Sequence, residues 1–201
     1  MQRPYYPKYP GHTLNYFELQ IIKAFLSGAT IFISEDSYDS SEEEEFPKVL
    51  PRRCLRAKTD SKVIVGIAIV AGLGQGTLTD DDRAYLKHRK ESIVVLDHDK
   101  DMEAVKSYID QTEVAKLEYF EGCQLKVDTL VVGGPYMDRG HGTSLLTACT
   151  NLADSCVARM AGSFTPWSRE IARKSGFDIK DLPVKYKDSS FTMGLGVREP
   201  R

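Results

Sequence analysis

Apolar residues recur with helical spacing near the start of the chain. Four of them fall on one face of residues 16–26, namely Phe17, Ile21, Ala24 and Phe25. Gly28 follows this stretch, and glycine suits the left-handed position that commonly ends a helix. We therefore predict an amphipathic helix over residues 16–26.

A polar segment comes next. Serines and acids dominate residues 34–45, which end in four consecutive glutamates. Because a run of like charge cannot be buried without partners, it is typical of a solvated loop. We predict a loop over residues 34–45. Attraction of a cationic substrate is an alternative role for the same charges.

β-Branched residues then mark the first strands. Residues 53–57 and 63–71 are strand-prone and are separated by the turn-like segment 58–61, so they are predicted to pair as an antiparallel hairpin. The glycines of residues 72–76 lack the third glycine of a dinucleotide-binding turn and are interpreted as a loop. Charged residues 80–121 follow, with predicted helices at 83–90 and 102–109.

The clearest pattern begins at residue 124. Residues 124–132 are predicted to form a strand, and a glycine-containing turn over 133–143 follows. A helix with a continuous apolar face comes next; the face comprises Leu145, Ala148, Cys149, Leu152 and Ala153. Residues 156–161 then read as another short strand. This order predicts a βαβ unit with parallel strands.

The glycines of that turn indicate an anion site. Without Cβ atoms, Gly140 and Gly142 let backbone N–H groups approach a ligand at the start of a helix, where unpaired donors and the helix dipole favour phosphate. The motif of P-loop NTPases is absent, because no lysine precedes Thr143. The sequence therefore predicts a phosphorylated cofactor.

Two segments resemble motifs of the GNAT superfamily, the Gcn5-related N-acetyltransferases. Residues 124–154, with Arg139-Gly140-His141-Gly142-Thr143 at their centre, resemble motif A, and residues 156–177, with the closing pair Gly176-Phe177, resemble motif B. The residues of these motifs and their order are most similar to those of fungal-type members. The resemblance is specific from residue 124 to residue 177 and weak before residue 63.

The resemblance implies a mixed α/β (α+β) fold. Its centre would be a mixed, mostly antiparallel sheet of about seven strands, flanked by helices, in which two parallel strands splay apart. Residues 180–186 and 191–197 would supply the last two strands. The whole chain, 1–201, would be one acetyltransferase domain, with a divergent part at 1–60 and a core at 62–201.

The resemblance also implies acetyl-CoA as the cofactor. Backbone groups of the first splayed strand would hold the pantetheine arm, and the glycine turn would hold the diphosphate. The residues so implicated are Leu130, Val131, Val132, Arg139, Gly140, His141, Gly142, Thr143 and Lys174. Three positions depart from the family pattern. Met137 replaces a side-chain donor, and Ala172 stands where a tyrosine often acts as general acid. Asp138 stands where glycine or a basic residue is common, and its side chain is expected to point into solvent.

Transfer to an amine requires the neutral nucleophile. An alkylamine with a pKa of ~10.4 is neutral in only about 1 molecule in 2500 at pH 7, so a general base is needed or the acceptor is less basic. Asp128, on the strand before the turn, is the candidate base, although an ion pair with a neighbouring basic residue is an alternative role. Ser168 and Tyr186 are the candidate general acids, and His141 is expected to pack or to donate to phosphate.

The composition and net charge of the chain restrict the kinds of partner that we expect. The formal net charge is −2, so no basic field favours nucleic acid, and neither a signal peptide nor a membrane-spanning stretch is recognisable. We expect a cytoplasmic monomer or homodimer without a metal, acting on a small-molecule or peptide amine. The alternative, suggested by the three departures, is a catalytically impaired acyl-CoA-binding relative that acts as a sensor or interaction module.

Overall fold

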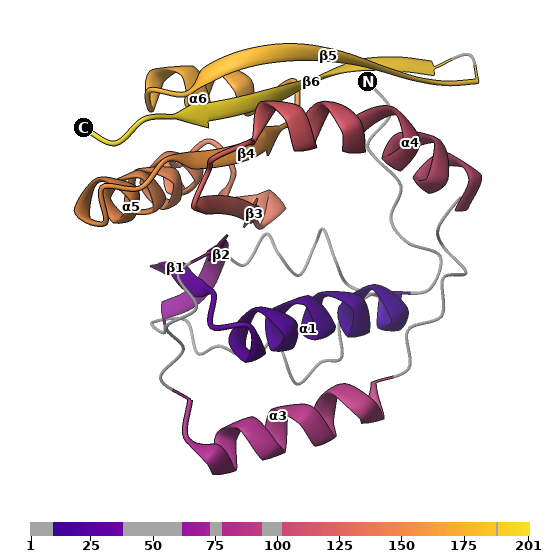
Figure 1. Cartoon of the computed structure of the whole chain (residues 1–201). Coiled ribbons are helices and arrows are strands. Elements are labelled where there is room, and N and C mark those ends of the chain that lie inside the picture. The colour runs from indigo at the N-terminus through magenta and orange to yellow at the C-terminus, as the bar shows by residue number, and fades with distance from the viewer. Residues whose placement is uncertain (1–9, 38–61, 73–77, 94–101, 188) are drawn as a thin grey trace.

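The computed structural model describes residues 10–37, 62–72, 78–93, 102–187 and 189–201 (Figure 1). Its strands are β1 (Thr30–Ser37), β2 (Lys62–Ala71), β3 (Leu125–Val132), β4 (Met160–Phe164), β5 (Asp178–Tyr186) and β6 (Ser189–Arg198). They form one sheet in the order β1-β2-β3-β4-β6-β5. Only β3 and β4 are parallel neighbours, and the other four pairs are antiparallel. The predicted mixed, mostly antiparallel sheet is confirmed, although six strands rather than about seven lie in the described residues.

Five α-helices and one short 3₁₀-helix accompany these strands within the described residues. The α-helices are α1 (Pro10–Leu26), α3 (Asp80–Ser92), α4 (Met102–Tyr119), α5 (His141–Ser155) and α6 (Arg169–Lys174), and the 3₁₀-helix η1 covers Gly134–Tyr136. The predicted helices at 16–26, 83–90 and 102–109 are confirmed as parts of α1, α3 and α4. Each is longer than predicted; α3, for example, starts where the Thr79 hydroxyl accepts the N–H of Asp82 at 3.1 Å.

The loop predicted over residues 34–45 is wrong in its first part. Residues 34–37 complete β1, which pairs with β2 through a bulge between Ser34 and Glu35. β1 also takes the place beside β2 that was predicted for residues 53–57. Residues 38–45 and 53–57 lie outside the described residues, as do residues 73–77 of the predicted glycine loop.

The predicted strand at 156–161 is displaced. Helix α5 continues to Ser155, and its end is closed by N–H groups of Val157 and Ala158 bonding to the carbonyls of Asp154 and Ala153. Val157 takes a positive φ of 50° in this turn, so the chain enters β4 only at Met160. The βαβ unit itself is confirmed, because β3 and β4 are parallel and α5 connects them.

The core places α5 against the middle of the sheet. Buried side chains of α5, including Leu145, Leu146 and Cys149, pack with Ala68 and Val70 of β2 and with residues of β3 and β4. A second apolar cluster joins β5 and β6 to α4. Since its apolar face is fixed on the sheet in this way, α5 presents its first turn beside the carboxyl end of β3.

Candidate cofactor and active site

The parallel pair opens at Asp128. β3 and β4 pair over only three positions, from Leu125–Met160 to Val127–Gly162. On the other side of β3, the register with β2 passes from Ile69–Thr129 to Val70–Val127, which leaves Asp128 as the extra residue of a β-bulge. A bulge increases the local twist, so β3 turns away from β4 at the point where their ladder stops. Beyond Val127 the edge of β3 that faced β4 is available to another partner.

A cavity of about 170 Å³ lies in this opening. Four of its lining residues were predicted site residues or belong to the predicted turn: Asp128, Leu130, Gly142 and Ser168. Phe164 and Ile171 supply apolar wall, while Ser163 and Thr165 add hydroxyl groups. The cavity is therefore lined on one side by β3 and the start of α5 and on the other by β4 and α6.

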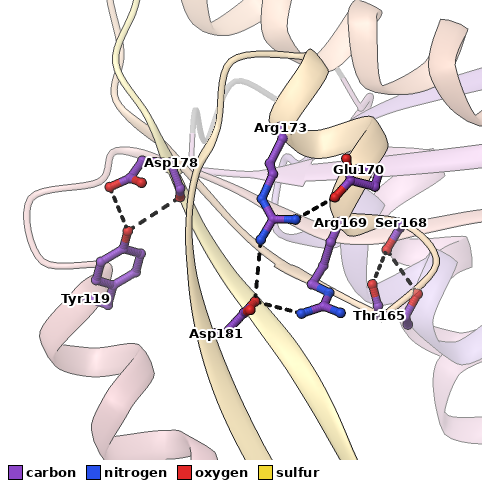
Figure 2. Close-up of polar contacts among 8 residues, drawn as sticks. All are labelled: Tyr119, Thr165, Ser168, Arg169, Glu170, Arg173, Asp178 and Asp181. Atoms are coloured by element: carbon purple, nitrogen blue, oxygen red, sulfur yellow. Dashed lines mark hydrogen bonds and ion pairs between the residues drawn. The ribbon is translucent and has the colours of Figure 1, made fainter.

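Ser168 is fixed at the start of α6. Its Oγ donates to the carbonyl of Thr165 at 3.2 Å and lies 3.0 Å from the Thr165 Oγ1 (Figure 2). Helix α6 is tied to β5 by an ion-pair network in which Arg169 and Arg173 converge on Asp181, at 2.7 and 3.7 Å, and Arg173 also contacts Glu170 (Figure 2). The network keeps Ser168 in place over the cavity. Tyr186, the other candidate acid, lies at the β5–β6 hairpin end and does not line the cavity.

Asp128 makes an ion pair with its neighbour two residues back. Its Oδ1 lies 2.9 Å from the Nζ of Lys126, and both side chains are about half exposed. Asp128 thus pairs with a basic residue, which is one of the roles considered from the sequence, and it also lines the cavity. Its role as general base stays a prediction.

The glycine turn leads directly into α5. Gly140 is the N-cap with a φ of 88°, which favours glycine, and the N–H of Ser144 bonds to its carbonyl at 2.9 Å. A Cβ at Gly140 would meet no atom within 4 Å, and one at Gly142 would first meet Val132 at 3.9 Å. The space before the first turn of α5 is therefore open, as an anion seat requires. Asp138 is exposed, as predicted, and has a φ of 63°.

His141 is held between two side chains of β1. Its Nδ1 lies 2.7 Å from the Ser34 Oγ, and its Nε2 lies 3.0 Å from the Asp36 Oδ2. Arg139 also approaches Asp36, with Nη1 at 3.6 Å from Oδ2. Hydrogen bonds from the Ser37 N–H and from His141 hold the pKa of the Asp36 carboxyl below its usual range. Ser34 and Asp36 were not identified from the sequence, since more than 100 residues separate them from His141.

A second cavity follows the outer side of α5. It measures about 400 Å³, and its lining includes Thr143, Lys174, Arg198 and Arg201. Thr143 and Lys174 were both predicted to bind the cofactor, and the structure brings them to one cavity. Arg198 and Arg201 had no local signal in the sequence. Ile171 lines both cavities, which are therefore neighbours near the start of α5 and α6.

Val131 and Val132 differ in their surroundings. Val131 pairs with Ile67 of β2 and its side chain is partly exposed, whereas Val132 pairs with Gly66 and packs against the core below α5. Neither side chain lines the cavity between the splayed strands. Their predicted contribution to cofactor binding through the backbone stays a prediction.

Across the parts of the chain that the structure describes, no group of three or more His, Cys, Asp or Glu side chains could hold a metal ion. In the same parts, no helix is both long and apolar enough to cross a bilayer.

Comparison with known proteins gives similarity in structure alone. No family model matches the sequence, and no curated protein matches it. Solved structures that resemble it include Drosophila melanogaster polyamine N-acetyltransferase (11% identity, covering 92% of this chain and 96% of that one, TM-score 0.44). Two others are mosquito arylalkylamine N-acetyltransferase-like 5b (14%, 91% and 95%, 0.41) and Arabidopsis thaliana NAA60 in complex with acetyl-CoA (13%, 84% and 99%, 0.34). At these identities and TM-scores the similarities assign no function to this chain.

Proposed function

We propose that the chain is a GNAT-type N-acetyltransferase that uses acetyl-CoA and acts through one catalytic domain. The observation that carries the proposal is the splayed end of β3 and β4, where a lined cavity opens beside the glycine-capped start of α5. The pantetheine arm of acetyl-CoA is thin, extended and rich in amide groups. It suits such an opening, because the edge of β3 beyond its pairing with β4 offers backbone donors and acceptors.

The remaining parts of the cofactor fit the adjoining surfaces. The open first turn of α5, with Arg139 beside it, suits the diphosphate. The groove that contains Lys174 and Arg201 suits the phosphorylated nucleoside end, because these cations and several threonine and serine hydroxyls line it. Arg198, which also lines the groove, is paired with Asp154. The two cavities share Ile171 as a lining residue and are therefore neighbours, and in our proposal one elongated ligand spans all three places.

Acetyl-CoA supplies an activated acetyl thioester when bound. The overall reaction makes one amide and one free thiol, and it moves one proton from the amine to the leaving thiolate. In our proposal Asp128 accepts the amine proton, through a water if the shorter aspartate does not reach it directly. Ser168, rather than Tyr186, is the proposed donor to the sulfur, because Ser168 lines the cavity.

The ion pair of Asp128 with Lys126 supports a second candidate function. The Lys126 ammonium occupies one carboxylate oxygen of Asp128, and Ala172, buried in α6, offers no hydroxyl. These features favour an acyl-CoA-binding module without turnover. The acceptor of the enzyme is proposed only by class, as a small-molecule or peptide amine.

One pair of measurements tests both functions. Thermal unfolding is followed with and without CoA, and release of free thiol from acetyl-CoA is followed with polyamines, arylalkylamines, aminoglycosides and peptides. The enzyme is stabilised by CoA and releases thiol with at least one amine class, whereas the binding module is only stabilised. Stabilisation by NAD but not by CoA would contradict both.

A further inference from the structure

A carboxylate lies beside the proposed diphosphate seat. Asp36 of β1 contacts both basic side chains of the glycine turn: its Oδ2 is 3.0 Å from the His141 Nε2 and 3.6 Å from the Arg139 Nη1. The His141 side chain is 14% exposed and the Asp36 side chain 31%, so this contact is partly shielded from water. An anionic ligand entering the seat therefore meets an anion of the protein.

The ring of His141 has no nitrogen left for a ligand. Because a carboxylate only accepts hydrogen bonds, Nε2 donates to Asp36, and Nδ1 is engaged with the Ser34 Oγ at 2.7 Å. This geometry matches the packing role expected of His141, and donation of its side chain to phosphate stays a prediction. Arg139 makes the longer contact with Asp36, so we expect it to be the basic residue of the turn that exchanges its partner.

Asp36 is held by two hydrogen bonds, whereas Arg139 contacts it at a longer distance and also lies over the Tyr136 ring, 5.1 Å from the ring centroid. The Oδ1 of Asp36 accepts the N–H of Ser37 at 2.8 Å, and its Oδ2 accepts from the His141 ring. The Arg139 side chain is 41% exposed, and its contact with Asp36 is longer than a hydrogen bond. When a diphosphate arrives, Arg139 can turn toward it while the carboxylate stays beside the seat.

We propose that Asp36 limits the affinity of this seat for diphosphates by competing for Arg139. The inference rests on the proposed function, because it places the diphosphate of the cofactor at the start of α5. In the protein without ligand, the Asp36 carboxylate takes the place of the diphosphate beside Arg139 and offsets the charge of its guanidinium. When a diphosphate approaches, the same carboxylate repels it. Weaker retention of the cofactor would favour release of the product CoA.

The substitution Asp36→Asn tests this. Asparagine keeps an oxygen that accepts the Ser37 N–H and removes the charge. Its NH2 group then faces the His141 Nε2, which accepts when the ring takes the other tautomer and Nδ1–H donates to the Ser34 Oγ, so the strand and the turn can remain packed. The matched control is Asp138→Asn, which removes a carboxylate from the same turn, and asparagine tolerates the positive φ there. Binding of CoA and of inorganic diphosphate is measured by calorimetry on the full chain at low salt.

Asp36→Asn is expected to bind both ligands about tenfold more tightly than the unaltered chain. Asp138→Asn is expected to bind them within about twofold of it. When Arg139 is replaced by glutamine, adding Asp36→Asn should raise the affinity for either ligand by no more than Asp138→Asn does, because the cation for which Asp36 competes is gone. Equal or weaker binding by Asp36→Asn overturns the inference, and so does an unchanged gain in the Arg139→Gln background.

The two ligands separate this inference from the function on which it rests. If CoA binds the unaltered chain and Asp36→Asn equally, the proposed function stands and the inference fails. If CoA binds neither while inorganic diphosphate binds Asp36→Asn more tightly than Asp138→Asn, the inference stands and the function fails. Absence of binding by both ligands to every variant overturns both.

Discussion

Arg198 and Asp154 join the last strand to the last turn of α5 through two parallel hydrogen bonds. Arg198 Nη1 donates to Oδ1 at 2.8 Å and Nη2 donates to Oδ2 at 2.7 Å, while Arg198 Nε donates to the carbonyl of Ser175. The Arg198 side chain is 4% exposed. One residue therefore fixes β6, α5 and the end of α6 around the cavity that contains Lys174.

Replacing Arg198 by lysine is expected to destabilise the fold, because lysine cannot make the paired contact and leaves the partly exposed Asp154 carboxylate incompletely bonded. Arg89→Lys is the matched control: Arg89 also makes a two-pronged contact, with Glu18, but both of those side chains are about 40% exposed. Thermal unfolding should show a fall in melting temperature several times larger for Arg198→Lys than for Arg89→Lys. Equal falls in melting temperature would show that the contact with Asp154 contributes no more to stability than the exposed pair of Arg89 and Glu18.

The same contact predicts a pH dependence. The hydrogen bonds from Arg198, and then the N–H of Arg201, lower the pKa of Asp154 to about 2. Because the folded pKa lies below the ordinary value of 3.8, the stabilisation is complete above pH ~4 and is lost as the pH falls through about 2. The difference in unfolding free energy between the unaltered chain and Asp154→Asn should be constant from pH 5 to pH 7 and shrink below pH ~4. A difference that grows on acidification would contradict the assignment.

Local patterns in the sequence were sufficient for the βαβ unit. A strand, a glycine turn and an apolar helical face follow one another within residues 124–155, and each is set by its own residues. The displaced start of β4 shows the limit of this reasoning, because the apolar residues after Ser155 are equally compatible with a strand or with a helix end. Hydrogen bonds from Val157 and Ala158 decided the outcome.

Long-range contacts left no such pattern. Ser34 and Asp36 looked like the start of an acidic loop, and nothing near them in sequence shows that His141 lies between them. Arg198 and Asp154 are likewise 44 residues apart. The glycine cradle could be predicted, but the charge placed beside it could not, because that charge comes from another part of the sheet.

The cysteines should differ in reactivity. Burial raises the pKa of the Cys149 thiol to about 12, so that only about 1 molecule in 10⁴ is a thiolate at pH 8. Cys156 is exposed. Alkylation followed by peptide mass spectrometry should label Cys156 within the time in which Cys149 stays unmodified, until denaturant is added. Rapid native labelling of Cys149 would contradict its burial, and Cys156→Ser is a useful background for any thiol-release assay.

Gly142 tests the location of the proposed cofactor. Gly142→Val places a branched side chain toward the cavity between β3 and β4, where the nearest atoms to a Cβ are Val132 Cγ2 at 3.9 Å and Leu130 Cδ2 at 4.0 Å. The contact is ordinary, so the chain should fold with a similar melting temperature. CoA binding should fall by about 100-fold or more, since the loss of a few kcal/mol is a factor of that size. Gly142→Ala should be intermediate, and retained affinity in both variants would contradict the site.

Asp128 and Lys126 allow the proposed base to be separated from a simple ion pair. Asp128→Asn removes both the carboxylate and the pair, whereas Lys126→Met removes the pair and keeps the carboxylate at the cavity. If Asp128 is the general base, Asp128→Asn should lower kcat by about 10²–10⁴-fold with little change in CoA affinity. Lys126→Met should then retain activity, because the Asp128 carboxylate stays at the cavity. The measurement is steady-state thiol release with a saturating amine, and equal losses in the two variants would leave Asp128 with a structural role only.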